Sequence, residues 1–378
     1  MTVVVIGAGM VGAATANELH RRDVDVLLLD AGEVSGGTTG LGEGNVLCSD
    51  KDAGPELELT VLGRALYAEL DARFGPVAQI RRKGALVVHP DAQSWADEPA
   101  RLQRLHAAGV EGELIDPDRV RELEPALSGA VHGALHVPGD LQCAPRAIAR
   151  ALAAEVPRVR TGVCVERIAT DPLRVVLVGG EHVAADAVVL AAGPWSAALA
   201  ATAGLHLPVE PRWGQLVQLA APAGPPLVRR KVVGGSYLAS VASAAAGLQL
   251  STVIETTFDG HVLVGSSRAR RGFDDAVDPA VSGAMIERAT ALMPTVGRLS
   301  VMRAWSGLRP WLPDHRPAIG PSHAVPGLWV ATGHEGAGVA LGPVTGRLLA
   351  QLLTGEAPLM DPAPFDPDRF VAVASAAP

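Results

Sequence analysis

Cysteine is scarce in this chain. The three that occur, Cys48, Cys143 and Cys164, match neither a disulfide framework nor the spacing of a metal site. Such usage is typical of proteins from a reducing compartment. The first residues also lack the basic region that begins a secretory signal. We therefore expect a cytoplasmic protein that holds no metal ion.

Segments with strong positive charge are missing as well. Lysine and arginine total 32 residues against 40 aspartates and glutamates, which gives a formal net charge of −8. Proteins that bind nucleic acid or anionic membranes usually concentrate positive charge in one region. We therefore expect no nucleic-acid partner.

Two stretches carry no charge and are long enough to cross a membrane, residues 187–207 and 232–254. Gly193-Pro194 interrupts the first, and the second is rich in glycine and serine and contains Gln249. Both patterns indicate buried strands, turns and helices rather than membrane spans.

What the chain does have, close to its start, is a glycine-rich turn between two apolar runs, residues 3–6 and 24–29. The second run ends at an aspartate. In a strand–turn–helix–strand unit, the first glycine permits the tight turn and the second lets the backbone approach a pyrophosphate. The third glycine lets the helix pack on the strand, and the helix N-terminus attracts phosphate. A carboxylate after the second strand suits a free ribose 2′-hydroxyl. The predicted dinucleotide-binding residues are Gly7, Gly9, Met10, Val11, Gly12 and Asp30.

Two styles of secondary structure alternate along the chain. Runs typical of buried parallel strands lie at the start, the middle and the end, and alternating runs typical of antiparallel strands lie between them. The predicted parallel strands are 3–6, 187–191 and 328–333, and the predicted antiparallel strands include 85–89, 130–137 and 213–219. A hairpin with a two-residue Asp259-Gly260 turn is predicted within 254–264. The predicted helices include 55–73, 145–154, 279–292 and one that begins at about Pro343.

This order of elements predicts an α/β fold with two domains, each discontinuous in sequence. One is a Rossmann-like dinucleotide-binding domain. The other is an α+β substrate domain with an antiparallel sheet. The expected boundaries are 1–80, 141–207 and 305–378 for the first domain, and 81–140 and 208–304 for the second.

Three further segments carry a family resemblance. They are 187–196 (AVVLAAGPWS), 305–320, which begins WSGLRP, and 327–346, which contains ATGHEGAG. Together with the N-terminal motif, and in the same order, they resemble the flavin-contact segments of the D-amino acid oxidase superfamily. That superfamily includes glycine oxidase, sarcosine oxidase and dye-linked amino-acid dehydrogenases.

The resemblance implies one FAD per chain in the Rossmann-like domain, which is then an FAD-binding domain. It implies oxidation of the C–N bond of an amine or amino acid by hydride transfer to flavin N5, which produces an imine that hydrolyses. Some members attach the flavin through a cysteine in the C-terminal motif, and this chain has no cysteine after Cys164, so we expect non-covalent FAD. Further implied cofactor contacts are Thr38, Thr39, Gly44, Asn45, Val165, Ala192, Gly193, Gly333, His334, Gly336, Gly338 and Val339.

Three residues are candidates for the reaction itself. The planar guanidinium of Arg309 suits a carboxylate, and in glycine oxidase-like relatives the arginine of this segment grips the substrate carboxylate. The alternative for Arg309 is an ion pair with Asp314. Glu335 either holds a substrate ammonium or pairs locally. His334 is expected as a hydrogen-bond partner beside the flavin, with general-base catalysis as the other option.

Two positions near these candidates stay undecided. Relatives often carry a second clamping arginine at the position of Gly336, and this chain has none there. Glu43 is either catalytic or exposed.

Two other functions remain open on the same fold. A 2-hydroxy-acid oxidoreductase would need His334 as the base for the hydroxyl proton. A flavoprotein subunit of a multi-subunit amino-acid dehydrogenase would pass electrons to an iron–sulfur or other electron-transfer subunit. The sequence does not decide between oxygen and a redox partner as acceptor, nor which of Lys51, Lys83 and Lys231 lies near the flavin.

Overall fold

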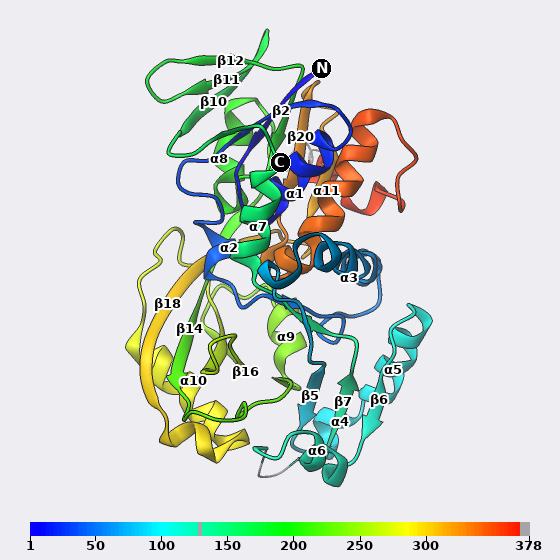
Figure 1. The fold of residues 1–378 in the computed structure, drawn as a ribbon, viewed down its shortest axis with the longest axis vertical. Helices are drawn as coiled ribbons and strands as arrows, with labels where there is room; N and C mark the ends of the chain where they lie inside the picture. The colour runs from blue at the N-terminus through cyan, green and yellow to red at the C-terminus, as the bar shows by residue number, and fades with distance from the viewer. Residues whose placement is uncertain (128–130, 371–378) are drawn as a thin grey trace, which may run out of the picture.

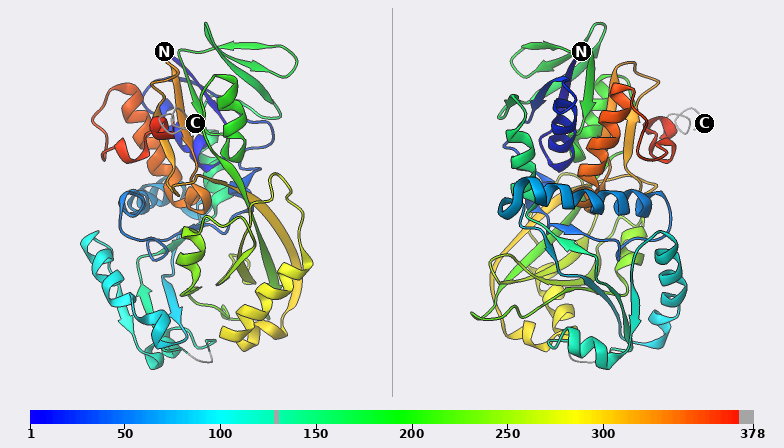
Figure 2. Two further views of the ribbon diagram at one scale, coloured as in Figure 1. Left: turned by 180° about the vertical axis from the view of Figure 1, so that it is seen from behind. Right: turned by 45° about the vertical axis from the view of Figure 1, so that its right-hand side comes forward.

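The structure is a computed structural model that describes residues 1–127 and 131–370. Two large sheets dominate it, and helix α3 (Pro55–Phe74) lies between them, as the right-hand view of Figure 2 shows. The six-stranded sheet lies in the upper half of Figure 1 and the eight-stranded sheet in the lower half.

The six-stranded sheet brings together strands from the beginning, the middle and the end of the chain. Its order is β19 (Ala318–Pro321), β20 (Leu328–Thr332), β13 (Ala187–Leu190), β1 (Thr2–Ile6), β2 (Asp25–Leu29) and β9 (Arg158–Arg160). All neighbours are parallel except β19 and β20. Parallel strands therefore end at one edge, where the predicted flavin-contact segments follow β1, β13 and β20.

Each face of this sheet is covered by a different layer, because alternate side chains of a strand point to opposite faces. Val3 and Val5 pack in one core with helices α1 (Met10–His20), α7 (Pro145–Ala154) and α11 (Gly338–Thr354), and with α3. Val4 and Ile6 pack in another core with helix α8 (Ser196–Thr202) and with the antiparallel strands β10 (Val165–Thr170) and β11 (Leu173–Leu177). Strand β12 (His182–Ala184) completes that small sheet.

The eight-stranded sheet is antiparallel apart from the pair β15–β5. Helix α10 (Pro279–Leu292) packs against it through Val281, Met285 and Ala289. The strand order is β18 (Ser300–Trp311), β14 (Glu210–Ala220), β17 (Val262–Arg268), β16 (Gln249–Thr256), β15 (Lys231–Gly234), β5 (Ala85–His89), β7 (Gly133–Val137) and β6 (Glu113–Ile115).

Shorter elements complete the fold. A three-stranded sheet has the order β3 (Asn45–Val46), β8 (Leu141–Gln142) and β4 (Arg81–Arg82). The remaining α-helices are α2 (Thr38–Leu41), α4 (Ala92–Trp95), α5 (Glu98–Ala107), α6 (Pro117–Leu123) and α9 (Tyr237–Ala242). The 3₁₀ turns are Gly75–Val77, Gly193–Trp195, Pro294–Arg298, Glu335–Ala337, Ala363–Phe365 and Pro367–Phe370.

The C-terminal helix begins earlier than predicted. Helix α11 starts at Gly338, so Pro343 lies inside it rather than at its first position. Proline has no N–H to donate to the carbonyl four residues before it, which is that of Val339. The hydroxyl of the buried Tyr67, on α3, donates to this carbonyl at 2.6 Å. A residue far away in the sequence therefore satisfies the group that proline leaves without a donor.

Two other local predictions need correction. The hairpin between β16 and β17 is present, but Phe258, Asp259 and Gly260 all lie between Thr257 and His261, so the predicted two-residue turn is wrong. Gly260 has a φ of +88°, as in a three-residue loop in which a glycine follows a tight turn. The strand predicted at 130–137 begins at Gly133, and Ala130 lies outside the described residues.

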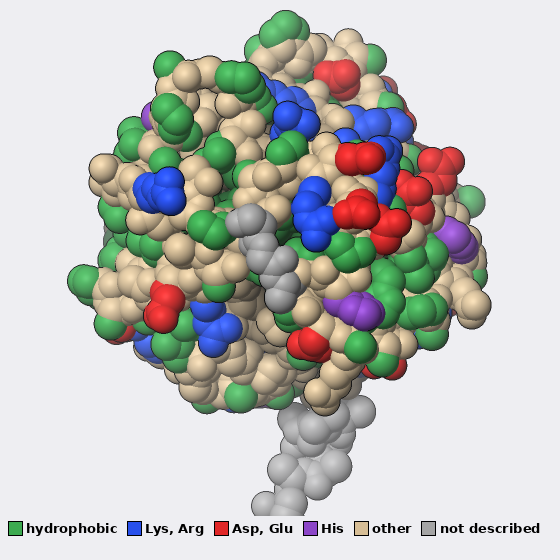
Figure 3. Space-filling view, turned by 90° about the horizontal axis from the view of Figure 1, so that it is seen from below, with side chains coloured by type: hydrophobic (Ala, Val, Ile, Leu, Met, Phe, Trp, Pro, Cys, Tyr) green, Lys and Arg blue, Asp and Glu red, His purple; other side chains and the backbone are tan. Residues whose placement is uncertain are grey.

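The two uncharged stretches fold as short elements. The first forms β13, a 3₁₀ turn and α8, and the second forms β15, α9 and most of β16. Within the described ranges, no helix is both long and apolar enough to cross a membrane. On the face shown in Figure 3, acidic and basic side chains are intermixed.

Candidate active site

One elongated cavity of about 940 Å³ joins the carboxyl edge of the six-stranded sheet to the eight-stranded sheet. Its walls include Gly7, Asp30 and Gly193 from the first sheet's loops, and Gly214 and Lys231 from the second sheet. Nearly all of the predicted site residues line it. The exceptions are Gly12 and Gly333, which lie behind its wall.

The glycines of the N-terminal motif are required by close packing. A Cβ on Gly7, whose φ is +104°, would lie 2.4 Å from the carbonyl oxygen of Ala191. A Cβ on Gly12 would lie 1.8 Å from the carbonyl oxygen of Gly7, so Gly12 brings α1 against the turn without touching the cavity. Gly333 is similar, because a Cβ there would lie 2.1 Å from Leu312 Cδ1. Any larger residue at these positions would displace backbone or a buried side chain.

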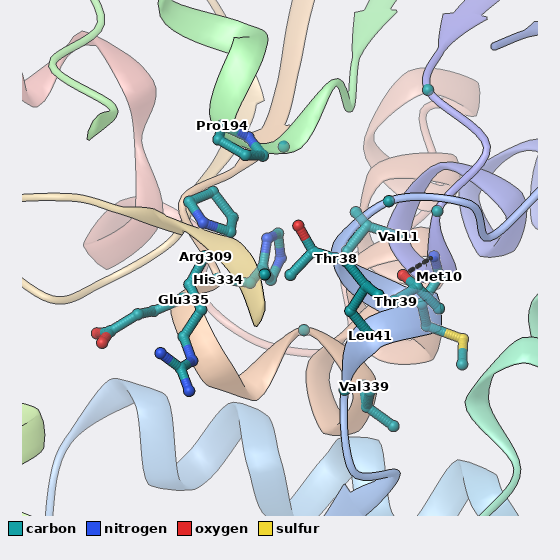
Figure 4. Close-up of a pocket in the computed structure, with 18 of the residues that line it drawn as sticks. Met10, Val11, Thr38, Thr39, Leu41, Pro194, Arg309, His334, Glu335 and Val339 are labelled. Atoms are coloured by element: carbon teal, nitrogen blue, oxygen red, sulfur yellow. Dashed lines mark hydrogen bonds between the residues drawn. The ribbon is translucent and has the colours of Figure 1, made fainter. Parts of the chain in front are cut away.

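The N-terminus of α1 faces the cavity through Gly9, Met10 and Val11. Its first turn contains no acidic residue, and Gly9 contributes no side-chain cap. The hydroxyl of Thr39 accepts a hydrogen bond from Met10 N at 2.9 Å, the dashed line in Figure 4. The adjacent Thr38 hydroxyl donates to Leu308 O at 2.6 Å. The first bond holds this segment against α1 and the second holds it against β18. The helix N-terminus suits a pyrophosphate.

Asp30 lies at the end of β2 as predicted. Its carboxylate accepts backbone hydrogen bonds from Ala8 N at 2.6 Å and Gly32 N at 2.7 Å. A carboxylate has about four acceptor positions, so it retains capacity for ribose hydroxyls. Cys164 lines this same end, because Val163 N bonds to Asp30 O. These features together fit a dinucleotide such as FAD, whose ribose end would lie beside Asp30.

His334 is buried in the opposite region of the cavity. Its Nε2 lies 3.0 Å from the hydroxyl of Thr345, and burial lowers the pKa of His334 to about 3. The imidazole is therefore neutral at physiological pH and is a weak proton acceptor.

Glu335 follows with a φ of +46°, a conformation that non-glycine residues rarely adopt. Its carboxylate lies 2.8 Å from Arg212 Nη1 and 3.7 Å from Arg268 Nε. His315 lies 3.7 Å from the other oxygen. Burial alone would raise the pKa of Glu335, but His315 and the arginines lower it to about 2. Glu335 is thus an ionised residue with its own partners.

Arg309 projects from β18 into the cavity, on the same side as His334 and Glu335 in Figure 4. Its Nη1 donates to Ser267 O at 3.1 Å, and among the described residues no carboxylate lies within 4.0 Å of its guanidinium. Asp314, the alternative partner, pairs instead with Arg369 at 2.8 Å. Burial and the nearby Arg268 lower the pKa of Arg309, so an anionic ligand would stabilise its charge.

Gly214 makes room for this guanidinium. A Cβ on Gly214 would lie 2.0 Å from Arg309 Nη1 and 2.4 Å from Ser267 O. Gly336 lies beside the Arg309 side chain, since a Cβ there would be 3.8 Å from Arg309 Nε.

The sequence did not point to a second charged cluster in the wall. Glu43 pairs with Lys231, which lies 3.6 Å from the buried Glu255, and Glu255 in turn pairs with Lys83. Arg212 and Arg268 were missed as well. Because side chains alternate along β14, Arg212 lies on the same face as Gly214. This alternation is the one feature of the sequence from which Arg212 could have been predicted as a site residue. The partners of Lys231 and Arg268 come from distant segments: Glu43 lies in the loop before β3, Glu255 on β16 and Glu335 in a 3₁₀ turn.

Comparisons with known proteins identify the family of this chain. The family model described as FAD dependent oxidoreductase matches residues 2–352. Glycine oxidase from Pseudomonas aeruginosa is 30% identical over 377 residues, which cover 97% of this chain and 98% of that protein. D-amino acid dehydrogenase from Cereibacter sphaeroides is 28% identical over 434 residues, covering 98% of this chain and 96% of that protein.

The same likeness extends to three dimensions. The crystal structure of glycine oxidase from Geobacillus kaustophilus superposes with a TM-score of 0.86 at 28% identity, covering 96% of this chain and 97% of that one. The chain therefore belongs to the DAO family of FAD-dependent oxidoreductases.

Proposed function

We propose that this enzyme oxidises the C–N bond of an amino acid, with the substrate carboxylate bound by Arg309. The reaction class is FAD-dependent oxidation of an amine or amino acid. The observation that carries the proposal is a partly buried guanidinium that lines the cavity and has no carboxylate partner among residues 1–127 and 131–370. Arginine presents two parallel donors that match a carboxylate.

FAD, when bound, supplies the acceptor for the hydride that leaves the substrate carbon. The protein's contribution is orientation and exclusion of water. Arg309 holds the carboxylate end of the substrate, and Leu41, Leu216 and Val233 form apolar wall around it. Arg212 and Arg268 hold Glu335 in place, so the loop that carries His334 keeps its position.

Local pairing is the role we favour for Glu335, rather than binding of a substrate ammonium. Its carboxylate is already engaged by Arg212 and Arg268. The 2-hydroxy-acid alternative also loses support. Its general base would be His334, and burial lowers the pKa of His334 to about 3, so the imidazole is a weak base.

For the electron acceptor we retain two candidates, oxygen and an iron–sulfur or other electron-transfer subunit. An exposed aromatic pair favours the second. Trp195 lines the cavity and is 49% exposed, and it stacks on Phe273, which is 52% exposed, at 6.0 Å between ring centroids. Turnover of the purified single chain in air separates the candidates, because a dependent subunit shows negligible oxygen consumption.

We also propose non-covalent FAD, the two domains with the boundaries given above and a cytoplasmic location. Among the described cysteines, only Cys164 lines the cavity, and it lies at the Asp30 end rather than beside Arg309. The separate cores of the two large sheets support the division into two domains. The boundary at 305 is the exception, because β18 pairs with β14 along its whole length, so residues 305–311 belong to the substrate domain. All three cysteines are free thiols, in keeping with a reducing compartment.

The test is anaerobic mixing of the purified holoenzyme with panels of amino acids, amines and 2-hydroxy acids. We expect amino acids to bleach the flavin absorbance and to release ammonia. Bleaching by 2-hydroxy acids alone, without ammonia, would overturn the proposal.

A further inference from the structure

Glu43 stands in the cavity wall with one oxygen engaged and one free. Its Oε2 accepts from Asn45 Nδ2 at 2.7 Å and from Lys231 Nζ. Its Oε1 has no hydrogen-bond partner within the described part of the chain. Oδ1 of Asn45 is also buried without a partner. Two neighbouring side chains of the wall therefore each have an acceptor that lacks a donor, and this calls for a ligand rich in N–H groups.

The charges behind Glu43 balance without a ligand. Lys231, on β15, is 2% exposed, and Glu255, on β16, is fully buried. Lys83 pairs with Glu255, so the cluster holds two acids and two bases. Burial by itself would lower the pKa of Lys231, but Glu255 and Glu43 raise it overall. Lys231 thus stays charged, and its bond to Oε2 holds the Glu43 side chain in one orientation.

Stability alone gives little reason to bury such a cluster. Desolvating four charged groups costs about as much as their pairing returns, and apolar residues of similar volume are often as stable. A cluster of this kind beside a reaction cavity indicates a role in binding or catalysis.

Glu43 and Arg309 approach the same strand at neighbouring positions. A Cβ on Gly265 would lie 2.8 Å from Glu43 Oε1, and the carbonyl of Ser267 accepts from Arg309 Nη1 at 3.1 Å. Two residues of chain span at most about 7 Å. Both side chains therefore lie against neighbouring positions of β17 in the same cavity wall.

The two ends of this region have different charge. Arg212, Arg268 and Arg309 surround the single Glu335, which leaves an excess of positive charge at the Arg309 end. At the Glu43 end the facing groups are Lys231, Asn45 and, beyond them, Glu255, Lys83 and Gln142. The free acceptors lie at this neutral end.

We propose that Glu43, with Asn45, binds the ammonium group of the substrate while Arg309 binds its carboxylate, so that the cavity selects a zwitterionic α-amino acid. This inference rests on the proposed function. It also explains discrimination against other acids, since a plain carboxylate brings no donor to Oε1 of Glu43 and Oδ1 of Asn45, and a 2-hydroxy acid brings only one.

Two isosteric ligands test the proposal by binding rather than by turnover. 2-Aminoisobutyrate has an ammonium and a carboxylate but no α-hydrogen, so it cannot be oxidised at that carbon. Pivalate replaces the ammonium by a methyl group. Each is titrated into the holoenzyme while the perturbation of the flavin absorbance is recorded. We expect 2-aminoisobutyrate to bind more tightly than pivalate by on the order of tenfold or more, the range of a hydrogen bond to a charged group.

Glu43→Gln should abolish this preference and leave pivalate binding unchanged. Arg309→Ala should weaken both ligands, and Glu58→Gln, at an exposed position of α3, should weaken neither. Should Glu43→Gln fail to fold, Gly265→Ala keeps the charge but pushes on Oε1 of Glu43, and it should reduce the preference as well.

An unchanged preference in Glu43→Gln, or in Gly265→Ala where that variant is used, overturns the inference and leaves the proposed function standing. Failure of the unaltered enzyme to bind either ligand counts instead against Arg309 as a carboxylate site, and so against the proposed function itself.

Discussion

Gly214→Ala is the sharpest test of the position of Arg309. The added Cβ would lie 2.0 Å from Arg309 Nη1 and 2.4 Å from the carbonyl oxygen of Ser267. The carbonyl belongs to the backbone of β17, where Ser267 pairs with Leu250 of β16, so it cannot move freely. The guanidinium is the mobile partner. We therefore expect the substitution to expel it from its present position and to break its bond to Ser267.

The size of the effect follows from the contact that is lost. A hydrogen bond to a charged group contributes about 1.5–3 kcal/mol, which corresponds to a roughly 10- to 150-fold loss in kcat/KM for a substrate with a carboxylate. Overpacking of the wall should lower the free energy of unfolding by about 1–3 kcal/mol. Gly214 lies on β14, away from the Gly7–Gly12 motif, so FAD content should not change.

The assay compares an amino acid with the matching amine that lacks the carboxylate. Gly214→Ala should lower kcat/KM for the amino acid and leave kcat/KM for the amine equal to that of the parent enzyme. Gly283→Ala is the control, because nothing lies within 4 Å of its Cβ and it sits inside α10. That variant should be as stable as the parent or more so, by about 0.5–1 kcal/mol. Equal losses for both substrates in Gly214→Ala would refute the assignment of Arg309.

Three further outcomes are expected. Tyr67→Phe leaves the Val339 carbonyl without its donor, and the free energy of unfolding in urea should fall by about 1–3 kcal/mol; no change would show that water replaces the hydroxyl. The pKa of Glu335 is lowered to about 2 from 4.5, so its contribution to stability is present above pH 4.5 and is lost as pH falls toward 2. The unfolding free energies of the parent and Glu335→Gln should therefore converge over that interval, and parallel curves would contradict this. Acid precipitation should leave the pellet colourless and the FAD in the supernatant, whereas a yellow pellet would mean a covalent bond.

Local rules worked where one segment's own residues decide its structure. Pro55, Pro145 and Pro279 each begin a helix where predicted, because proline suits a first helical position and the residues that follow propagate the helix. Pro343 does not begin a helix, although the same rule predicts that it should. Its place inside α11 is tolerated because Tyr67, on another helix, donates to the carbonyl of Val339.

The candidate site divides in the same way. The glycine motif, Asp30 and Arg309 were predicted because their roles depend on spacing within one segment or on a family resemblance, and all but the packing glycine Gly12 line the cavity. The pairing of Glu43 with Lys231 joins residues 188 positions apart, and that of Arg212 with Glu335 joins residues 123 apart. The local sequence around each of these residues does not predict its partner.

The sequence by itself therefore determined the cofactor and the fold class, and it predicted Arg309 as the residue that binds a substrate carboxylate. Only the tertiary structure decided which charges neutralise one another around the cavity, and so which acceptors are left for a substrate. The physical reason is that backbone conformation at glycine and proline is a local property, whereas the electrostatic environment of a buried charge is set by whichever strands pack beside it.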